Sequence, residues 1–198
     1  TDLTALTLIF PPQEGLDTWT TLFWAWRPED GVLEAEQRDH VPYRDWGRAG
    51  FLELCPGDMV DFTMVEDTAA WCVEHFHLDT LGVDPYLSRT LTQRLMERGV
   101  NVVEIPQTMM SMSPAMKELE RLIRARQMLH EHNTCAQFCF GNVRCAVDGN
   151  ENRKPMKNRS IGRIDMAVAW IIAMAVAILR MPAGPDINEH ILSEDWGI

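Results

Sequence analysis

The sequence has no secretory signal, no disulfide framework and no apolar run long enough to cross a membrane. The apolar run at residues 166–179 is shorter than the roughly 20 residues that a membrane span needs, and the charged residues Asp165 and Arg180 border it. The cysteines are odd in number and their spacing fits no disulfide framework, which favours a protein of a reducing cytoplasm. They are Cys55, Cys72, Cys135, Cys139 and Cys145.

Positive charge is scarce overall and concentrated in one segment. The 198 residues carry a net charge of -11 with a pI near 4.9, so the surface as a whole is unsuited to non-specific binding of nucleic acid. Between residues 141 and 165 the balance is reversed, because six cations stand against three acids. Any contact with a polyanion is therefore expected in this segment.

The length and the hydrophobic fraction of 46% suit one well-buried globular domain, residues 1–198, whose last residues 181–198 form an acidic tail. The chain opens on Thr1 and goes directly into a strand-like pattern at residues 2–10. We therefore expect it to be part of a longer polypeptide.

Hydrophobic periodicity predicts an α/β protein. Alternation of apolar and polar residues predicts two antiparallel strands, 4–10 and 19–26, joined by a hairpin-like connection. The later segments are expected to be one or two short helices in 34–50, a strand at 51–54, a helix at 61–75, a strand at 78–83, a helix at 87–98, a strand at 100–105, a helix at 113–129, one or two strands in 135–147 and a helix from about 163. This order favours a mixed sheet flanked by helices.

The segment from residue 153 to residue 180, RKPMKNRSIGRIDMAVAWIIAMAVAILR, places a cluster of cations directly before one carboxylate and a long apolar helix. The apolar turns would fix the helix in the core, and its first turn would present Asp165 at the edge of a cleft. A metal-dependent nuclease needs such an acid beside a polyanion. The alternative is a core helix whose basic lead-in is solvated.

A second acid, Asp84, follows the strand predicted at residues 78–83. The carboxyl ends of strands in an α/β sheet are where ligands and catalytic groups gather, although a simple turn aspartate would have the same position. Asp84 and Asp165 together, one at a strand end and one at a helix start, can converge on divalent cations. Carboxylate oxygens suit Mg²⁺ or Mn²⁺.

Six blocks of the sequence resemble a known family. In order, they are DLTALTLIF, VPYRDWGRAGFLELCPGDMVDF, LGVDPY, RLMERGVNVVEIPQ, MSMSPAMKELERLI and RSIGRIDMAVAWIIAMA. Together they cover nearly the whole chain and are similar to the endonuclease domain of terminase large subunits of tailed bacteriophages. The order of the blocks is more specific than any one of them.

The resemblance implies an RNase H-like fold whose acids hold two divalent metal ions for the hydrolysis of phosphodiester bonds. At the matching positions, Asp84 and Asp165 are the implied metal ligands. The candidates for contacts to DNA phosphates are Lys154, Lys157, Arg159 and Arg163, with a solvated surface as the alternative. The implied function is cleavage of concatemeric phage DNA during genome packaging, in the host cytoplasm.

The resemblance also implies partners: double-stranded phage DNA, the small terminase subunit and the portal protein, without a membrane. An oligomer is expected only in the assembled packaging motor. The sequence contains no GxxxxGK[ST] loop, so the ATPase half of a terminase is absent from it.

One departure from the family lies at the start of the chain. Members carry an Asp-Leu-Ser-like segment on the first strand, which supplies the first catalytic aspartate; here the match begins at Asp2, so this strand is expected to be truncated. Asp2 is expected near the site but is a weak candidate for its principal catalytic acid. We therefore predict weak metal binding and poor cleavage by the chain alone.

Three alternatives remain open at this point. The chain could be a catalytically incomplete interaction module that docks to the portal, the capsid or the small terminase subunit. It could be another RNase H-like enzyme, such as a recombinase or a junction resolvase, although the PYRDWGRAG and MSPAMKELERL blocks would then be unexplained. A zinc site built from His130, His132 and the nearby cysteines is a weaker alternative, because the spacing lacks CxxC pairs and small buried thiols are commoner.

Overall fold

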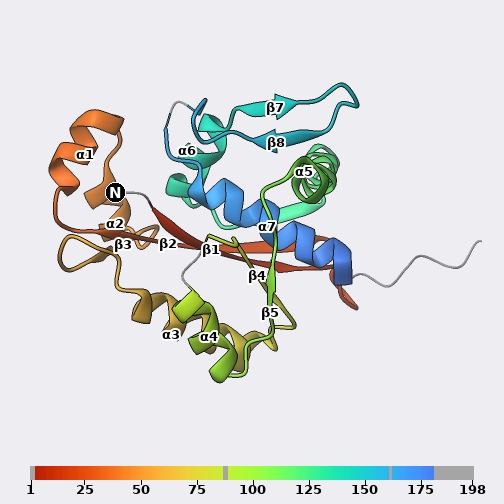
Figure 1. The fold of residues 1–198 in the computed structure, drawn as a ribbon, viewed down its shortest axis with the longest axis horizontal. Helices are drawn as coiled ribbons and strands as arrows, with labels where there is room; N and C mark the ends of the chain where they lie inside the picture. Colours follow the sequence, from red (N-terminus) through yellow and green to blue (C-terminus); the bar gives the residue numbers. More distant parts are fainter. Residues whose placement is uncertain (1–2, 87–88, 161, 181–198) are drawn as a thin grey trace, which may run out of the picture.

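The computed structural model describes residues 3–86, 89–160 and 162–180 and confirms the mixed α/β architecture (Figure 1). Asp2 and the predicted acidic tail, residues 181–198, lie outside the described residues. The elements are β1 (Thr4–Phe10), β2 (Trp19–Pro28), α1 (Val32–Asp39), α2 (Tyr43–Arg48), β3 (Glu53–Cys55), α3 (Phe62–Phe76), β4 (Leu81–Val83), α4 (Arg89–Glu97), β5 (Val102–Glu104), α5 (Met109–Arg124), β6 (Met128–His130), α6 (Thr134–Asn142), β7 (Cys145–Val147), β8 (Arg153–Pro155) and α7 (Asp165–Arg180).

The strands form three separately hydrogen-bonded sheets among the described residues. β1 and β2 pair antiparallel, from Thr4 opposite Trp26 to Phe10 opposite Thr20, as the alternation predicts. β3 and β6 run parallel to β2 and pair with its two ends. β4 and β5 form a parallel pair, and β7 and β8 an antiparallel hairpin. No backbone hydrogen bonds between described residues join β1 to β4.

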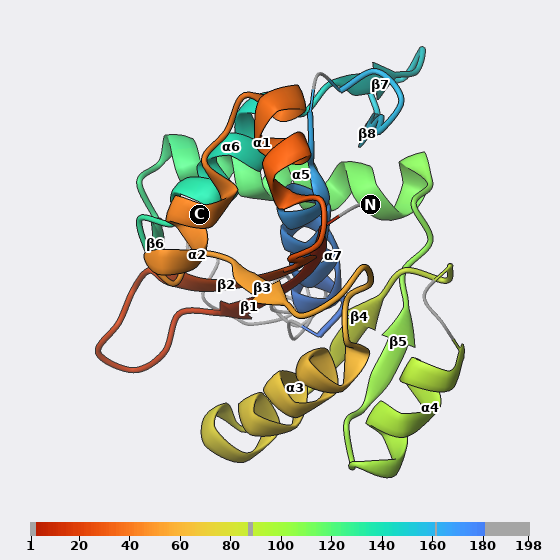
Figure 2. The same ribbon diagram turned by 90° about the vertical axis from the view of Figure 1, so that its left-hand side faces the viewer.

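Helices cover both faces of the β1–β2 sheet. Because successive side chains of a strand point to opposite faces, Phe23 and Ala25 enter one core and Leu6 and Trp26 enter the other. α5, α6 and α7 lie on the first face, and α3 and α4 lie on the second (Figure 2). Within the described part of the chain, no helix is long and apolar enough to cross a membrane.

The structure corrects two predicted elements. The helix predicted at 113–129 spans Met109–Arg124 instead, and residues 128–130 form β6. It begins earlier because the Thr108 hydroxyl caps it by accepting a hydrogen bond from the Ser111 backbone, and Pro114 lies inside it. The strands predicted in 135–147 are wrong over the first half of that range, where α6 forms. The Asn133 side chain caps α6 by accepting a hydrogen bond from the Ala136 backbone.

Gly82 fixes the position of β4 against α7. A Cβ atom on Gly82 would lie 2.5 Å from Val176 Cγ2 and 2.8 Å from Ile172 Cγ2, so only a glycine allows this close contact between strand and helix. The contact matters for the site because Asp84 follows β4 immediately and Asp165 begins α7.

We expect Gly82→Ala to destabilise the protein by about 1–3 kcal/mol, because the added methyl group overpacks the contact with α7. Chemical denaturation followed by circular dichroism measures the change. Gly149→Ala is the matched control, since nothing lies within 4 Å of a Cβ at that position. Equal losses of stability in the two variants would contradict the role given to Gly82.

Candidate active site

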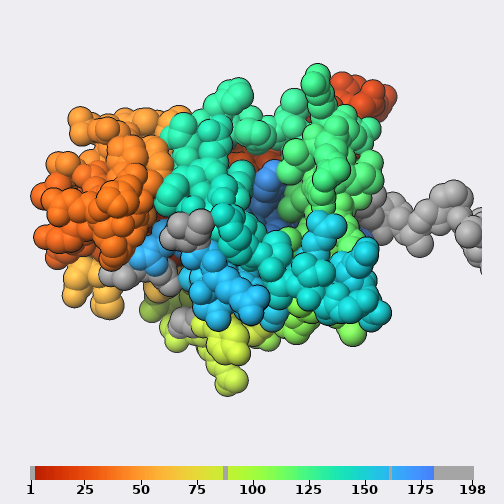
Figure 3. All heavy atoms as spheres, turned by 90° about the horizontal axis from the view of Figure 1, so that it is seen from above, coloured from red at the N-terminus to blue at the C-terminus, as the bar shows by residue number. Residues whose placement is uncertain are grey.

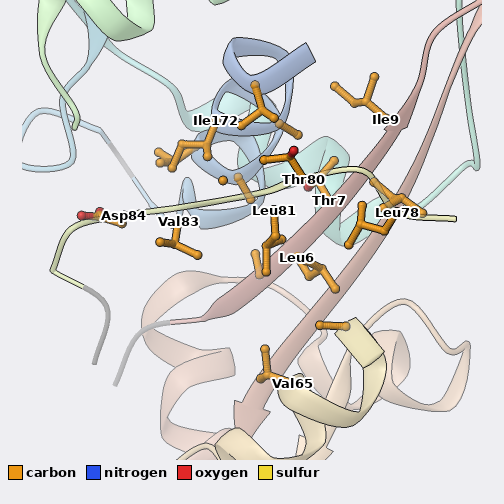
Figure 4. A pocket seen from close by; sticks show the side chains of 18 of the residues that line it. Leu6, Thr7, Ile9, Val65, Leu78, Thr80, Leu81, Val83, Asp84 and Ile172 are labelled. Atoms are coloured by element: carbon orange, nitrogen blue, oxygen red, sulfur yellow. The ribbon is translucent and has the colours of Figure 1, made fainter. Parts of the chain in front are cut away.

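A groove separates β1 from β4 and carries both predicted acids along its lining. Its volume is about 1020 Å³. The backbone edge of β1 lies along one side, residues 78–84 lie along the other, and α7 lies beneath. Figure 4 shows Leu6, Val83 and Ile172 facing into this space, with Asp84 where β4 ends. The groove is apolar along most of its length and acidic at the end formed by Asp84 and Asp165.

Asp84 is held at the carboxyl edge of the parallel β4–β5 pair. One of its carboxylate oxygens, Oδ1, accepts a hydrogen bond of 3.0 Å from the Tyr86 backbone. The other, Oδ2, accepts a short hydrogen bond from the side-chain amide of Gln107, a residue in the segment after β5. The Ile105 backbone continues the pairing by donating to the Val83 carbonyl at 2.8 Å. The local fold thus fixes the carboxylate at the groove.

Asp165 is the first residue of α7, and a carboxylate is favourable there because the helix dipole is positive at that end. Its Oδ1 accepts a hydrogen bond of 2.9 Å from Lys157 Nζ. Its Oδ2 is buried and accepts no hydrogen bond within the described residues. Buried polar atoms without a partner are uncommon in proteins, and an ion is one of the explanations for them.

The predicted cations lie in different surroundings. Arg159 is exposed, and Lys157 contacts Asp165 directly. Lys154 Nζ donates to the Gln107 carbonyl at 3.2 Å, so this lysine also lies beside the acidic end of the groove. Arg163 is only 18% exposed, and its Nε lies 3.8 Å from an oxygen of Asp39. Lys154, Lys157 and Arg159 can therefore face a polyanion, whereas the Arg163 side chain lies beside Asp39 of α1.

Asp39 carries its negative charge at neutral pH and so can pair with Arg163. Burial raises the pKa of the Asp39 carboxyl, but hydrogen bonds from Arg38 and from the Tyr43 hydroxyl, together with the positive charges of Arg38 and Arg27, lower it by more. The net pKa therefore lies below the ordinary value. Arg163 thus contributes to holding α1 next to the connection that leads into α7.

The zinc alternative finds no support among the described residues, where no three His, Cys, Asp or Glu side chains gather to hold a metal ion. Cys135 and Cys139 are buried on α6 and free of disulfides. Hydrogen bonding with Cys139, together with burial, raises the pKa of the Cys135 thiol. Burial also raises the pKa of Cys72 to about 11. Both thiols are therefore protonated at neutral pH, and these cysteines are core residues as expected.

Sequence reasoning missed Gln107, which contacts both Asp84 and Lys154. A signal was available, because the Ile105-Pro106-Gln107 run follows the strand that pairs with β4. The carboxyl ends of neighbouring parallel strands meet at one edge, so the residue after each strand is a candidate for the same site.

The residues present fit a hard divalent cation. Asp84 and Asp165 supply carboxylate oxygens at one end of the groove, and Asp165 Oδ2 is an acceptor that no described residue uses. Mg²⁺ is commonly bound by one or two carboxylates, with water and substrate phosphates as its other ligands. Two acids are therefore enough to begin such a site.

The fold and the groove together define a class of protein. The mixed sheet has helices on both faces, one acid follows a strand, and another begins a helix. This is an RNase H-like α/β protein. The comparison with protein families is more specific. Residues 1–180 match the family described as "Terminase large subunit, endonuclease domain", and the chain belongs to that family.

Individual relatives agree. The chain is 29% identical over 178 residues to the terminase large subunit of Enterobacteria phage HK97, covering 89% of this chain and 35% of the relative. It is 30% identical over 179 residues to the protein YmfN of Escherichia coli K12, covering 87% and 39%. The crystal structure of the HK97 bacteriophage large terminase matches with a TM-score of 0.79 at 28% identity, covering 88% of this chain and 36% of that one. The chain thus spans less than two fifths of each relative.

Proposed function

We propose that this domain is a divalent-metal-dependent DNA endonuclease that cleaves concatemeric phage DNA during genome packaging. Asp84 and Asp165 would hold Mg²⁺ or Mn²⁺ in a two-metal site. The observation that carries the proposal is the groove that brings these two carboxylates to one end, with Asp165 Oδ2 buried and unused by described residues. Its partners would be double-stranded DNA and, in the complete protein, the small terminase subunit and the portal.

Each residue would have a distinct task. Asp84 and Asp165 bind the ions, and Gln107 keeps the Asp84 carboxylate oriented through its amide. Lys154, Lys157 and Arg159 would lie along the DNA backbone and position the phosphate. Arg163 would hold the same segment in place through its ion pair with Asp39. When bound, the metal ions would activate the attacking water and stabilise the leaving oxygen.

We further propose that the groove receives one extended strand that carries a third carboxylate. The edges of β1 and β4 that face the groove pair with no other described strand, although backbone N–H and C=O groups require partners when buried. Thr7 Oγ1 on β1 is likewise buried without a hydrogen-bond partner. β1 and β4 run in opposite directions along the groove (Figure 4), so a strand between them can pair antiparallel with β1 and parallel with β4.

The strand would be covered on both faces. α7 supplies Val168, Ile172 and Val176 on one side, and α3 and α4 supply Val65 and Leu91 on the other. Strands buried on both faces are nearly continuous runs of apolar residues. An Asp-Leu-Ser-like segment within such a run matches this requirement and would bring its aspartate toward Asp84 and Asp165.

A synthetic peptide tests both parts of the proposal. The probe is a ten-residue peptide rich in valine and isoleucine that contains Asp-Leu-Ser, and its matched control contains Asn-Leu-Ser. Both peptides are expected to raise the melting temperature, because both can pair with β1 and β4. Only the aspartate peptide is expected to increase the nicking of supercoiled plasmid in Mn²⁺, by at least about tenfold over the chain alone.

The outcomes separate the two parts. Stabilisation by both peptides without any gain in nicking would contradict the catalytic proposal and leave the strand-binding groove in place. Strong nicking by the chain alone, unaffected by either peptide, would contradict the third carboxylate.

The interaction module remains the second candidate function. One observation favours it: among the described residues, no three acids, histidines or cysteines lie so that they could together hold a metal ion, and the described site is therefore short of ligands for two metal ions. The absence of Mn²⁺-dependent nicking both with the aspartate peptide and in the full-length protein, together with retained binding to a portal or small-subunit preparation, would favour it over the nuclease.

A further inference from the structure

Lys157 lies in the connection between β8 and α7 and contacts Asp165. The second carboxylate oxygen of Asp165, Oδ2, accepts no hydrogen bond from the described residues. The Lys157 ammonium nitrogen lies 2.9 Å from Asp165 Oδ1. The lysine side chain is 57% exposed, whereas the Asp165 side chain is 14% exposed. The lysine is therefore the more exposed partner of this ion pair, and the acid lies in the first turn of α7.

The neighbouring β7–β8 hairpin reaches the second acid, Asp84, indirectly through Gln107. Lys154 Nζ donates to the Gln107 carbonyl, and the Gln107 amide donates to Asp84. In Figure 3 the segment in cyan and light blue that contains β7 and β8 lies on the molecular surface beside α5, in green. Cations of one surface segment thus touch both sides of the acidic end: Lys157 binds the Asp165 carboxylate directly, and Lys154 reaches Asp84 through Gln107.

An ammonium group and a divalent cation compete for the same carboxylate. Both bind its oxygens at short range, and two positive charges within a few ångströms repel each other, most strongly where water is partly excluded. The exposed, flexible partner moves at the lower cost, because a lysine side chain in solvent regains its rotamer freedom. The Asp165 carboxylate is largely buried at the first turn of α7 and therefore has less room to move.

We propose that Lys157 is a resident cation of the site that exchanges with the divalent metal, and that it thereby sets the metal affinity of Asp165. This inference rests on the proposed metal site. The ammonium neutralises Asp165 until a metal ion displaces it, and the displaced group then faces outward from the mouth of the groove, where DNA phosphates would lie. Lys157 is thus a positioning residue that acts on the metal through Asp165.

Isothermal titration with Mn²⁺ alone, without DNA, tests the exchange. Lys157→Gln is expected to bind Mn²⁺ roughly two- to fivefold more tightly than the parent chain, the range that follows from losing one partly exposed ion pair. Lys157→Arg keeps a cation and is expected to stay close to the parent. Lys117→Gln on the exposed surface of α5 is the charge-matched control and is expected to leave the affinity unchanged.

A second measurement follows the lysine itself. Amine acetylation followed by mass spectrometry reports the reactivity of each lysine, and Mn²⁺ is expected to increase the labelling of Lys157 by at least about twofold relative to Lys117. Lys154→Gln removes a cation from the hairpin without touching Asp165, so its Mn²⁺ affinity is expected to change less than that of Lys157→Gln.

The possible failures are distinguishable. If the parent binds Mn²⁺ but Lys157→Gln binds it equally or more weakly, and Mn²⁺ does not raise the labelling of Lys157, the exchange is wrong while the metal site stands. If neither the parent nor the parent with the aspartate peptide binds Mn²⁺ at millimolar concentrations, the proposed metal site itself is wrong, and the inference falls with it.

Discussion

Replacing Asp165 with asparagine is expected to weaken Mn²⁺ binding by about 100-fold and to reduce Mn²⁺-dependent nicking of plasmid DNA to background. The amide keeps the size of the side chain but removes the charge of a groove acid whose buried Oδ2 has no hydrogen-bond partner among the described residues. Changes to groups that merely support a metal ligand cost about 10- to 100-fold, so the loss of a ligand should cost at least as much. Asp84→Asn is expected to have a similar effect.

The fold should survive both substitutions. Asp165 sits at a helix start and pairs with a half-exposed lysine, interactions that contribute about 1 kcal/mol or less each. Asp45→Asn is the matched control, because Asp45 is 65% exposed and its partner Arg48 is on the surface. Titration calorimetry, plasmid nicking and chemical denaturation are measured on all three variants, with the aspartate peptide present. Robust nicking in Mn²⁺ that survives Asp84→Ala would remove the assignment of the active site.

Replacing Trp170 with alanine is expected to lower the free energy of unfolding by about 3–5 kcal/mol, the range for truncating a buried tryptophan. Trp170 is 6% exposed on α7 and packs against Phe23 and Phe140, with ring centroids 5.5 Å and 4.8 Å away. Its indole N–H donates to the Thr21 hydroxyl at 3.2 Å. The substitution therefore creates a cavity where α7 crosses β2, and Asp165 lies on the same helix.

Trp71→Ala is the matched control for this core substitution. Trp71 is 43% exposed on α3 and stacks on His75, so its loss is expected to cost about 1 kcal/mol or less. Urea denaturation measures both changes. Similar losses in the two variants would mean that α7 is not anchored through Trp170, and the position of Asp165 would then need another explanation.

Local patterns were sufficient for much of the fold. The alternation at residues 4–10 and 19–26 predicted the two strands, because successive side chains of a strand point to opposite faces of a sheet. The hairpin-like connection between them predicted the antiparallel pairing that the structure has. The helix predicted at 61–75 agrees with α3 to within one residue at each end. Asp61 caps α3 by accepting a hydrogen bond from the Thr63 backbone, which is a local interaction between residues two positions apart. The strand prediction over α6 was wrong because its Cys, Phe and Ala residues suit a buried helix as well as a strand.

The sequence by itself determined where the two acids stand: Asp84 after a strand and Asp165 at the start of an apolar helix, each fixed by residues next to it. Tertiary structure alone decided what surrounds them. The groove between β1 and β4, the Gln107 amide on Asp84, the Lys157 ammonium on Asp165 and the Arg163–Asp39 pair all depend on which segments meet in space. Periodicity and capping are local, whereas strand pairing and side-chain contacts join residues that are distant in the chain.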